Sequence, residues 1–338
     1  MARWFPQPGI PAEEALLAMN ISAIVPVWNG RDLLAGLLAS LDAQTLPVGE
    51  LIVVDNGSAD GAPDLARAHG ARVIPMGRNC GFAPAVNRGI AEARHPLVAI
   101  LNTDVVLAPD YLEKLAAAQA PFATGKLLSP AGTLDGSFDL TTRAATTWRA
   151  GAGLPDAPPF DVGREITSAP WTAVLYRAEV LREVGLLEES FESYLEDVDF
   201  GLRCVAHKVL GRYVPEARAT HLGSASLGRW HAETVRRLAR NQVLLAARHL
   251  SARHMWRAAI GQFLWAGVAF RHGRGLAWIQ GKFQGLRLFS ASRRKFQQKD
   301  PELLEQVLLS NEEFLRKNCA DRYWKLYFSL TGVGQSDT

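Results

Sequence analysis

Three acids stand within four residues in the run Glu196-Asp197-Val198-Asp199. Neighbouring carboxylates repel one another, and a carboxylate in partly apolar surroundings, here flanked by Tyr194 and Phe200, has a raised pKa. Such a group can serve as a general base near neutral pH. The alternative is that these acids open a helix, where the positive end of the helix dipole favours them. The residues alone leave both interpretations open.

Asp104 ends the string Leu101-Asn102-Thr103-Asp104. A carboxylate at a strand end can hold Mg²⁺ or Mn²⁺, which prefer oxygen ligands. Such an ion would bridge a nucleotide diphosphate and neutralise the charge that grows on it as a bond breaks. As a lone feature, an Asp at this place is more often a polar strand-end residue. His221 could complete a metal site with Asp104, or it could be an ordinary hydrogen-bonded loop histidine, which is the favoured interpretation of that residue alone.

Asp55 directly follows the apolar run Leu51–Val54. Its carboxylate could accept a hydrogen bond from a base imide or a ribose hydroxyl, but on the string Asp55-Asn56-Gly57-Ser58 alone an Asx turn is the favoured interpretation. Further along, a glycine-flanked loop at residues 77–83 enters a predicted helix, where backbone N–H groups and Arg78 can receive an anion. The chain has no G-x-G-x-x-G string after its first strand and no Walker motif.

The elements that must position these residues alternate along the first half of the chain. Apolar runs predict strands at Ile21–Val27, Leu51–Val54, Ala71–Pro75 and Leu97–Leu101, and helical spacing predicts helices at Asp32–Leu41, Asp64–His69, Ala83–Ala93 and Pro109–Ala118. This alternation predicts βαβ units and a mainly parallel sheet. Ligands of such sheets bind beyond the carboxyl ends of the strands, and the polar residues at 28–29, 55–56 and 102–104 fall at those ends.

The pattern loosens between Thr124 and Phe160, where we expect loops and a short β-ribbon. The later elements are predicted as a strand at Trp171–Tyr176, a helix at Ala178–Val184, a helix opened by the acids within Phe191–Ala206, and a strand-like Tyr213–Val214 that leads to His221. Arg-rich helical segments begin after Leu227. We therefore predict an N-terminal extension at 1–18, an α/β domain at 19–226 and a helical C-terminal region at 227–338.

The charge of the chain is unevenly distributed. Its formal net charge is +3, yet residues 229–295 contain 14 Lys or Arg residues and one acid, Glu233. Basic helices that also carry Trp residues (Trp230, Trp256, Trp265 and Trp278) fit an anionic membrane surface. The alternative is a helical subdomain or homodimer interface whose arginines pair with the acidic body. No nucleic-acid-binding motif accompanies the charge, so we expect no nucleic-acid partner.

Two further features bear on the compartment. The longest uncharged run after residue 230, Ala258–Phe270, is far shorter than the ~20 apolar residues that cross a bilayer. The three cysteines are widely spaced and form neither a metal-binding nor a disulfide pattern, which suits a reducing compartment. We expect a cytoplasmic protein that is peripheral on the inner face of the cytoplasmic membrane.

Taken together, the motifs resemble the inverting glycosyltransferases of family 2, which share the GT-A fold. The matching strings, over about two-thirds of the chain, are Val25-Pro26-Val27-Trp28-Asn29, the run from Val53 to Gly61, the run from Asn79 to Ile90, Leu101-Asn102-Thr103-Asp104, and the run from Tyr194 to Arg203. The Asn-x-Gly-Phe-Ala-x-x-x-Asn-x-Gly-Ile and Tyr-x-Glu-Asp-Val-Asp-Phe strings are typical of a rhamnosyltransferase-like branch of bacterial cell-surface polysaccharide synthesis.

The resemblance implies a role for each matching residue. Asp197 is the implied catalytic base, and Asp104 and His221 are the implied ligands of Mg²⁺ or Mn²⁺. The implied donor-nucleotide residues are Pro26, Trp28, Asn29, Asp55, Arg78, Asn79, Asn102 and Thr103. The chain departs from the family at Asn102, which replaces the first acid of a D-x-D-type motif, and at Trp171, which replaces a small residue. We therefore expect Trp171, together with Glu196, on the acceptor side.

The resemblance also implies the reaction. A rhamnose or another hexose would move from a dTDP- or UDP-sugar to a cell-envelope glycan or polyprenyl-diphosphate-linked acceptor, in one displacement that inverts the anomeric centre. A nucleotidyltransferase is a weaker alternative, because it should carry a Gly-rich loop with Lys or Arg after the first strand. A non-catalytic nucleotide-sugar binder is a third, and the joint presence of Asp55, Asp104, Glu196, Asp197 and His221 argues against it.

Overall fold

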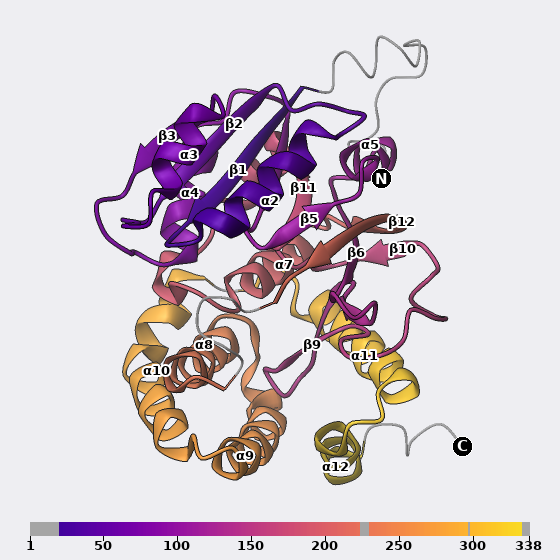
Figure 1. The fold of residues 1–338 in the computed structure, drawn as a ribbon. Helices are drawn as coiled ribbons and strands as arrows, with labels where there is room; N and C mark the ends of the chain where they lie inside the picture. Colours follow the sequence, from indigo (N-terminus) through magenta and orange to yellow (C-terminus); the bar gives the residue numbers. More distant parts are fainter. Residues whose placement is uncertain (1–19, 224–229, 297, 333–338) are drawn as a thin grey trace.

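A computed structural model describes residues 20–223, 230–296 and 298–332. Its N-terminal part alternates strands and helices as predicted (Figure 1). The elements are β1 (Ile21–Val27), α2 (Arg31–Asp42), β2 (Glu50–Asp55), α3 (Ala62–Ala68), β3 (Arg72–Pro75), α4 (Phe82–Glu92) and β4 (Leu97–Leu101). Strand β1 pairs in parallel with β2 and β4, and β2 pairs in parallel with β3. The carboxyl ends of these strands therefore lie at one edge of the sheet.

The sheet continues from β4 with strands from later in the chain. Its order is β10-β12-β6-β11-β4-β1-β2-β3, with β5 on β12 and β7 on β6. The added strands are β5 (Val105–Leu107), β6 (Phe122–Leu128), β7 (Leu134–Gly136), β10 (Arg164–Ile166), β11 (Ala173–Arg177) and β12 (Gly211–His221). Strand β11 is antiparallel to both of its neighbours, whereas β6 and β12 are parallel. The predicted fold class, a mixed and mainly parallel α/β sheet, is confirmed.

The expectation of loops after Thr124 is wrong for its first part, because β6 is a buried strand within the sheet. Gly125 and Lys126 made this segment look like a loop. The structure explains both residues: a Cβ on Gly125 would come within 2.2 Å of the carbonyl oxygen of Ala217, and the buried Lys126 ammonium pairs with Asp156. The expected β-ribbon is present as β8 (Asp139–Thr141) and β9 (Thr147–Arg149).

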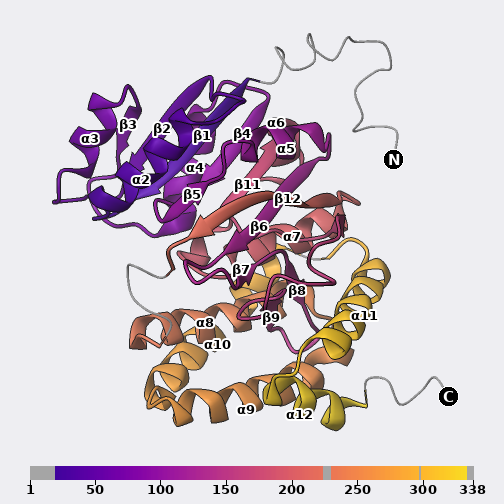
Figure 2. The ribbon, with the colours of Figure 1, turned by 45° about the vertical axis from the view of Figure 1, so that its right-hand side comes forward.

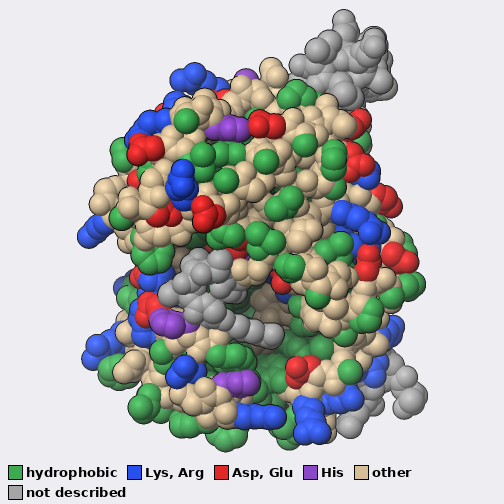
Figure 3. Space-filling view, in the orientation of Figure 1, with side chains coloured by type: hydrophobic (Ala, Val, Ile, Leu, Met, Phe, Trp, Pro, Cys, Tyr) green, Lys and Arg blue, Asp and Glu red, His purple; other side chains and the backbone are tan. Residues whose placement is uncertain are grey.

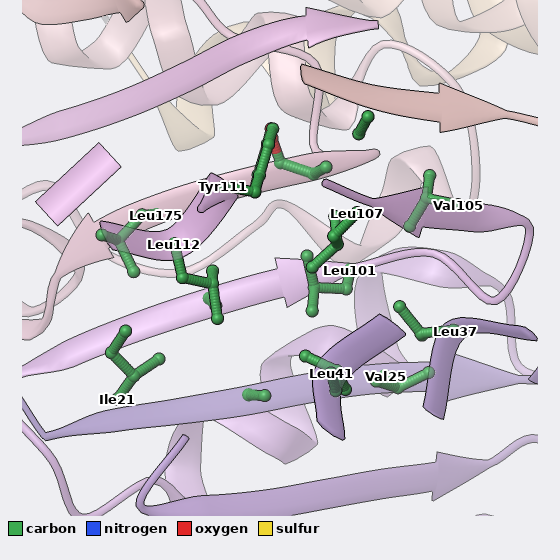
Figure 4. Close-up of a cluster of buried hydrophobic side chains, with 14 of the residues drawn as sticks. Ile21, Val25, Leu37, Leu41, Leu101, Val105, Leu107, Tyr111, Leu112 and Leu175 are labelled. Atoms are coloured by element: carbon green, nitrogen blue, oxygen red, sulfur yellow. The ribbon is translucent and has the colours of Figure 1, made fainter. Parts of the chain in front are cut away.

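Two layers of helices cover the sheet. Alternate residues of β1 point to opposite faces of the sheet. Ile21 and Val25 belong to the apolar cluster that α2 and α5 (Tyr111–Ala117) cover (Figure 4). Ile24 belongs to the other cluster, which α4, α6 (Ala178–Val184) and α7 (Glu196–Ala206) cover. Because β1 and β4 are buried on both faces, their sequences are continuous apolar runs rather than alternating ones.

The C-terminal region is helical, as predicted. Its helices are α8 (Ala232–His249), α9 (Met255–Arg271), α10 (Gly275–Lys295), α11 (Pro301–Asn318) and α12 (Arg322–Thr331). They gather at the end of the molecule opposite β1–β3 (Figures 1 and 2). None of the helices in the described ranges has the length and apolar character needed to cross a bilayer. The predicted extension at 1–18 and most of the predicted boundary at 225–230 lie outside the described residues.

A buried ion pair joins the C-terminal helices to the sheet domain. Arg143, between β8 and β9, donates from its backbone N–H to Glu312 Oε1 at 2.9 Å, and its guanidinium Nη2 lies 2.6 Å from Oε2. The Tyr327 hydroxyl of α12 donates to the same carboxylate at 3.1 Å. Glu312 is fully buried. The stability of this contact between the C-terminal helices and the sheet domain therefore depends on the pairing of the Arg143 charge with Glu312.

We predict that Glu312→Ala lowers the free energy of unfolding by about 3 kcal/mol, because it leaves the Arg143 charge buried and unpaired. Urea unfolding followed by circular dichroism measures this. The matched control is Asp64→Ala, which breaks the exposed pair with Arg67 and should cost less than about 1 kcal/mol. Equal unfolding midpoints for the two variants would contradict the prediction.

Candidate active site

Asp104 and His221 lie together because two short strands pair. In the antiparallel ladder of β5 and β12, His221 stands opposite Val105, the residue after Asp104. The Leu222 N–H donates to the Asp104 carbonyl at 2.8 Å and extends the ladder. As a result, His221 Nε2 lies 3.2 Å from Asp104 Oδ2. The structure thus brings together the two residues that the sequence analysis proposed as metal ligands.

A third residue, which the sequence analysis missed, orients His221. Asp135 of β7 lies with Oδ2 at 2.7 Å from His221 Nδ1. Burial disfavours the imidazolium, but hydrogen bonds to Asp104 and Asp135 outweigh it and raise the pKa of His221 to about 9. When no metal ion is bound, His221 is therefore charged near neutral pH, and its charge neutralises part of that of Asp104 and Asp135.

The Asp104–His221 pair has the chemistry of a partial metal site. Within the described ranges, no group of three or more His, Cys, Asp and Glu side chains is arranged to hold an ion. The two donor atoms are nevertheless 3.2 Å apart, close to the about 3 Å that separates neighbouring ligands of an octahedral ion with bonds near 2.1 Å. A metal-bound histidine usually hydrogen-bonds a carboxylate through the ring nitrogen that does not bind the metal. Here Asp135 occupies that place, at the Nδ1 of His221. The pair fits two ligands of an ion whose remaining positions are left for phosphate and water.

Asp197 stands in the first turn of α7 with a side chain that is 14% exposed. Its Oδ1 accepts the Val198 N–H at 2.8 Å, and the backbone N–H of Trp171 also interacts with the carboxylate. Burial, together with the nearby charge of Asp139, raises the pKa of Asp197 to about 6 against the opposing charge of Arg149. The carboxyl group therefore has the proton affinity that a base operating near neutral pH needs.

Arg149 connects the two parts of the site. Its guanidinium lies 3.7 Å from Asp197 Oδ2 and 3.3 Å from Asp139 Oδ1, and the charge of Asp135 also acts on it. The β8–β9 register places Asp139 opposite Arg149. The Arg149 side chain packs directly against Gly136: a Cβ added to this glycine would come within 2.3 Å of the Arg149 side chain. The charges of Asp197, Asp139 and Asp135 thus all act on one arginine, and Asp135 also binds His221. The sequence analysis did not single out Arg149, because it lies in the segment expected to be loops.

The other two acids of the Glu196-Asp197-x-Asp199 run have different environments. Burial first, and then the neighbouring charge of Asp197, raises the pKa of Glu196 well above its usual range, and its Oε2 has no described hydrogen-bond partner. Asp199 is fully buried, with Arg248 Nε at 2.5 Å and His249 Nε2 at 2.8 Å. These partners outweigh burial and hold the pKa of Asp199 far below its usual range. Glu196 therefore tends to stay protonated, whereas Asp199 is an anionic anchor between α7 and α8.

Trp171 lies behind the site. Its indole is 2% exposed, packs against Phe200 and Tyr176, and donates to the Tyr176 hydroxyl at 2.9 Å. The large side chain fills the core between β11 and α7, so in this structure it does not line the acceptor side as expected. Its contribution to the site comes instead from its backbone N–H beside Asp197.

The loops after β1, β2 and β3 form a second polar cluster. Asn29 Oδ1 accepts the Ala59 N–H at 2.8 Å, and the Asn29 N–H donates to Ser58 Oγ at 3.0 Å. Asp55 Oδ1 accepts the N–H of Ser58, three residues further on, at 2.9 Å, so this carboxylate oxygen is used within the turn after β2. Asn56, not singled out beforehand, binds the Gly81 carbonyl at 3.1 Å. These bonds fix the β1 and β2 loops against each other.

The remaining residues expected at the nucleotide border this cluster. Trp28, Arg78 and Asn79 are exposed, while Pro26, Asn102 and Thr103 are partly buried. Asn102 donates its backbone N–H to the Thr172 carbonyl at 2.9 Å. Thr103 is close to the β1 loop, since a Cβ on Gly30 would lie 3.6 Å from its Oγ1. The strand-end cluster therefore adjoins Asp104, and exposed side chains surround it.

Helix α8 supports the segment that leads into Asp197. Glu192, Tyr194 and Leu195 all have positive φ angles, between 59° and 76°, a region that costs non-glycine residues energy. The fully buried Asn241 amide lies 2.9, 2.9 and 2.7 Å from the carbonyls of Phe191, Ser193 and Tyr194. Asn241 thus holds a strained loop in place from a helix that the family motifs do not include.

The solved structures establish the class of the fold. The chain is similar to the crystal structure of GalNAc-T7 with UDP, GalNAc and Mn²⁺, with a TM-score of 0.63 at 12% identity. The match covers 89% of this chain and 58% of that one. At this identity the similarity concerns the fold alone. It identifies the sheet and its covering helices as the GT-A fold of glycosyltransferases.

Sequence comparison gives the family. Residues 22–185 match the family model described as glycosyl transferase family 2. The N-acetylglucosaminyl-diphospho-decaprenol L-rhamnosyltransferase of Mycobacterium tuberculosis is 29% identical over 265 residues, which cover 69% of this chain and 85% of that protein. An O-antigen biosynthesis protein of Myxococcus xanthus is 32% identical over 225 residues, covering 61% of this chain and 18% of that protein. The resemblance to glycosyltransferase family 2, over residues 22–185, and to a rhamnosyltransferase is thus confirmed.

We predict that Asn241→Ala loosens the segment before Asp197, because three carbonyls each lose a hydrogen-bond donor. The expected loss of local stability is about 2 kcal/mol, or roughly 30-fold faster opening. Hydrogen exchange followed by mass spectrometry should show faster exchange in residues 191–197 and unchanged exchange in β1 and β4. Asn318→Ala, which removes an amide bound to the Phe314 carbonyl of its own helix, is the control. Unchanged exchange at 191–197 in the Asn241 variant would refute the support role.

Proposed function

We propose that this protein is an inverting, metal-dependent hexosyltransferase that moves a sugar from a nucleotide-diphosphate sugar to a lipid-linked acceptor. The observation that carries the proposal is the position of Asp197. Its carboxyl group has a raised pKa and lies beside Arg149, on which the charge of Asp135, the partner of His221, also acts. Arg149 thus links the proposed base with a candidate diphosphate-binding centre. This arrangement suits a displacement in which an acceptor hydroxyl attacks and a diphosphate leaves.

In the proposed reaction the acceptor hydroxyl oxygen attacks the anomeric carbon, and the bond from that carbon to the diphosphate oxygen breaks. Asp197 takes the hydroxyl proton. Because a single attack comes from the face opposite the leaving group, the anomeric configuration inverts. Arg149 keeps Asp197 ionised until the proton arrives. Glu196, held protonated, can donate a hydrogen bond to an acceptor oxygen, which is the acceptor-side role that we propose for it.

We propose Asp104 and His221 as the ligands of Mg²⁺ or Mn²⁺, with Asp135 orienting the histidine. A bound ion would bridge the donor diphosphate and neutralise the charge of the leaving group. Asn102 in place of an acid leaves Asp104 as the only carboxylate of that strand-end string. The structure of GalNAc-T7, which has the same fold, was solved with Mn²⁺ and UDP, and this supports the choice of metal.

The donor nucleotide is proposed to bind at the ends of β1, β2 and β4. Asn29 and Asp55 shape the loops there, and the exposed Trp28, Arg78 and Asn79 are available to the base, ribose and phosphates. Pro26, Asn102 and Thr103 border the same strand ends. The name of the mycobacterial relative supports rhamnose as the sugar and a polyprenyl diphosphate as the acceptor anchor, with dTDP or UDP as the nucleotide.

A lipid-linked acceptor implies a place of action. We propose that the protein works in the cytoplasm, peripheral on the anionic inner face of the cytoplasmic membrane. The helical region at 227–338 is the proposed membrane-associating part, and 19–226 the proposed catalytic domain. The homodimer interface remains the competing interpretation of the helical region.

We predict that Asp197→Asn lowers transfer by about a thousandfold or more, because an amide cannot take the proton. In the wild type, transfer should rise as pH increases through about 6, the pKa of Asp197, since the base works only when deprotonated. Initial rates with a panel of dTDP- and UDP-sugars and a polyprenyl-diphosphate sugar acceptor measure both effects. Thermal shift with donor should be unchanged in the variant. Turnover at the wild-type rate would remove the base assignment.

We predict that Mn²⁺ binding in the presence of UDP or dTDP weakens at least tenfold in His221→Ala and about 10- to 100-fold in Asp135→Asn. Because a proton competes for His221 Nε2, the affinity should increase with pH up to about 9. Electron paramagnetic resonance of free Mn²⁺ measures the affinity. The exposed Asp161→Asn is the control. Equal affinity in all four proteins would show that the ion binds elsewhere.

A further inference from the structure

Helix α10 presents its small residues to the protein. Gly281 and Gly285 are buried where α10 crosses α8. A Cβ on Gly281 would come within 2.2 Å of the Arg236 carbonyl oxygen, and one on Gly285 within 2.7 Å of the Val243 side chain. The two helix backbones are therefore in close contact at these two glycines, where α10 has no room for a larger side chain.

The large apolar residues of α10 lie on its exposed side. Leu276, Ile279, Phe283 and Leu286 are 76%, 46%, 56% and 63% exposed. Their spacing of three, four and three residues puts them in one stripe along the helix. In a protein surrounded only by water, large apolar residues face the core and small or polar ones face outward. Helix α10 has the reverse arrangement, so its outer face matches an apolar environment.

Helix α9 carries a second stripe. Trp256, Phe263 and Phe270 follow one another at seven-residue intervals and are 48%, 78% and 57% exposed. The two stripes meet at the turn between the helices, where a Cβ on Gly275 would come within 2.3 Å of the Phe270 ring. Both helices lie at the end of the molecule farthest from β1–β3 in either view (Figures 1 and 2). We call these seven side chains the apolar stripe.

The segment that carries the apolar stripe contains basic residues but no acids. No Asp or Glu occurs between Glu233 and Asp300. Many of the arginines on α8 pair with the acidic body, as the sequence alternative expected: Arg240 binds Glu192 and Arg248 binds Asp199. On α9 and α10 and the turn between them, by contrast, the exposed residues Arg271, Arg274, Arg287 and Arg294 form no ion pair with any described acid. Basic and hydrophobic side chains also share the lower part of the surface drawn in Figure 3.

We infer that the apolar stripe and these four arginines are a docking surface for an anionic lipid bilayer, with α9 and α10 lying in the interface. This inference rests on the proposed lipid-linked acceptor and names the surface that brings the enzyme to it. Apolar side chains enter the acyl boundary while cationic ones contact lipid phosphates. A second copy of the chain is a poorer occupant, because a symmetric contact would place arginines against arginines with no acid to pair them. Nucleic acid would satisfy the charge but leave the seven apolar side chains in water.

The test is sedimentation of the full chain with vesicles of phosphatidylcholine and phosphatidylglycerol in equal parts. The wild type should bind these vesicles, and bind pure phosphatidylcholine vesicles at least about tenfold more weakly. The triple variant Phe263→Ser, Phe270→Ser, Phe283→Ser should lose at least about tenfold in binding to the anionic vesicles. Val162→Ser with Leu186→Ser, two exposed apolar residues on the sheet domain, is the matched control and should bind like the wild type.

Three outcomes would overturn the inference. They are no binding of the wild type to anionic vesicles at low salt, equal binding of the triple variant, and light scattering that shows a wild-type dimer converted to a monomer by the triple substitution. Failure here is distinguishable from failure of the proposed function. The triple variant should keep donor binding in thermal shift and slow hydrolysis of the donor sugar, neither of which requires a membrane. If the wild type neither binds the donor nor hydrolyses it, the transferase proposal is refuted instead.

Discussion

Five carboxyl groups converge on this site, and two cations hold them together. Asp104 and Asp135 share the His221 imidazolium, while Asp139 and Asp197 share the Arg149 guanidinium. Burial and the charge of Asp197 raise the pKa of Glu196, which reduces its share of the repulsion. So much like charge in a largely buried space is stable only while these cations stay in place. The positions of β7, β8 and β9 around the parallel sheet follow from this constraint, because they supply Asp135, Asp139 and Arg149.

The same balance sets the chemistry. A carboxylate paired fully with an arginine would be too weak a base, and one without a cation would be protonated near neutral pH. Asp197 lies between these limits, because its contact with Arg149 is long, at 3.7 Å, and Asp139 competes for the same guanidinium. Asp199, two residues further on, is held as an anion by Arg203, Arg248 and His249. The two neighbouring Asp residues thus differ in proton affinity because of their partners, not because of their position on the helix.

Local sequence patterns were sufficient to predict the half of the fold that consists of βαβ units. The continuous apolar runs of β1, β2 and β4 and the polar residues at their ends correctly predicted these strands and their parallel pairing. Strand β6 was missed because Gly125 and Lys126 make sense only through contacts with Ala217 and Asp156. The same holds for the site: motifs indicated Asp104, Asp197 and His221, whereas Asp135, Arg149 and Asn241 lie in segments without a motif. Trp171 looked like a pocket residue from its place in the motif, and only packing against Tyr176 and Phe200 shows it to be core.

Helix α8 explains why a catalytic domain and a basic helical region belong to one chain. One side of α8 supplies Asn241 and Arg240 to the strained loop before Asp197, together with Arg248 to Asp199. Its other side is in backbone contact with Gly281 and Gly285 of α10. Helix α8 therefore contacts both the loop before Asp197, the proposed base, and the helix that carries part of the apolar stripe. That geometry suits an acceptor whose sugar is anchored at a membrane and whose reactive hydroxyl must meet the base close to that surface.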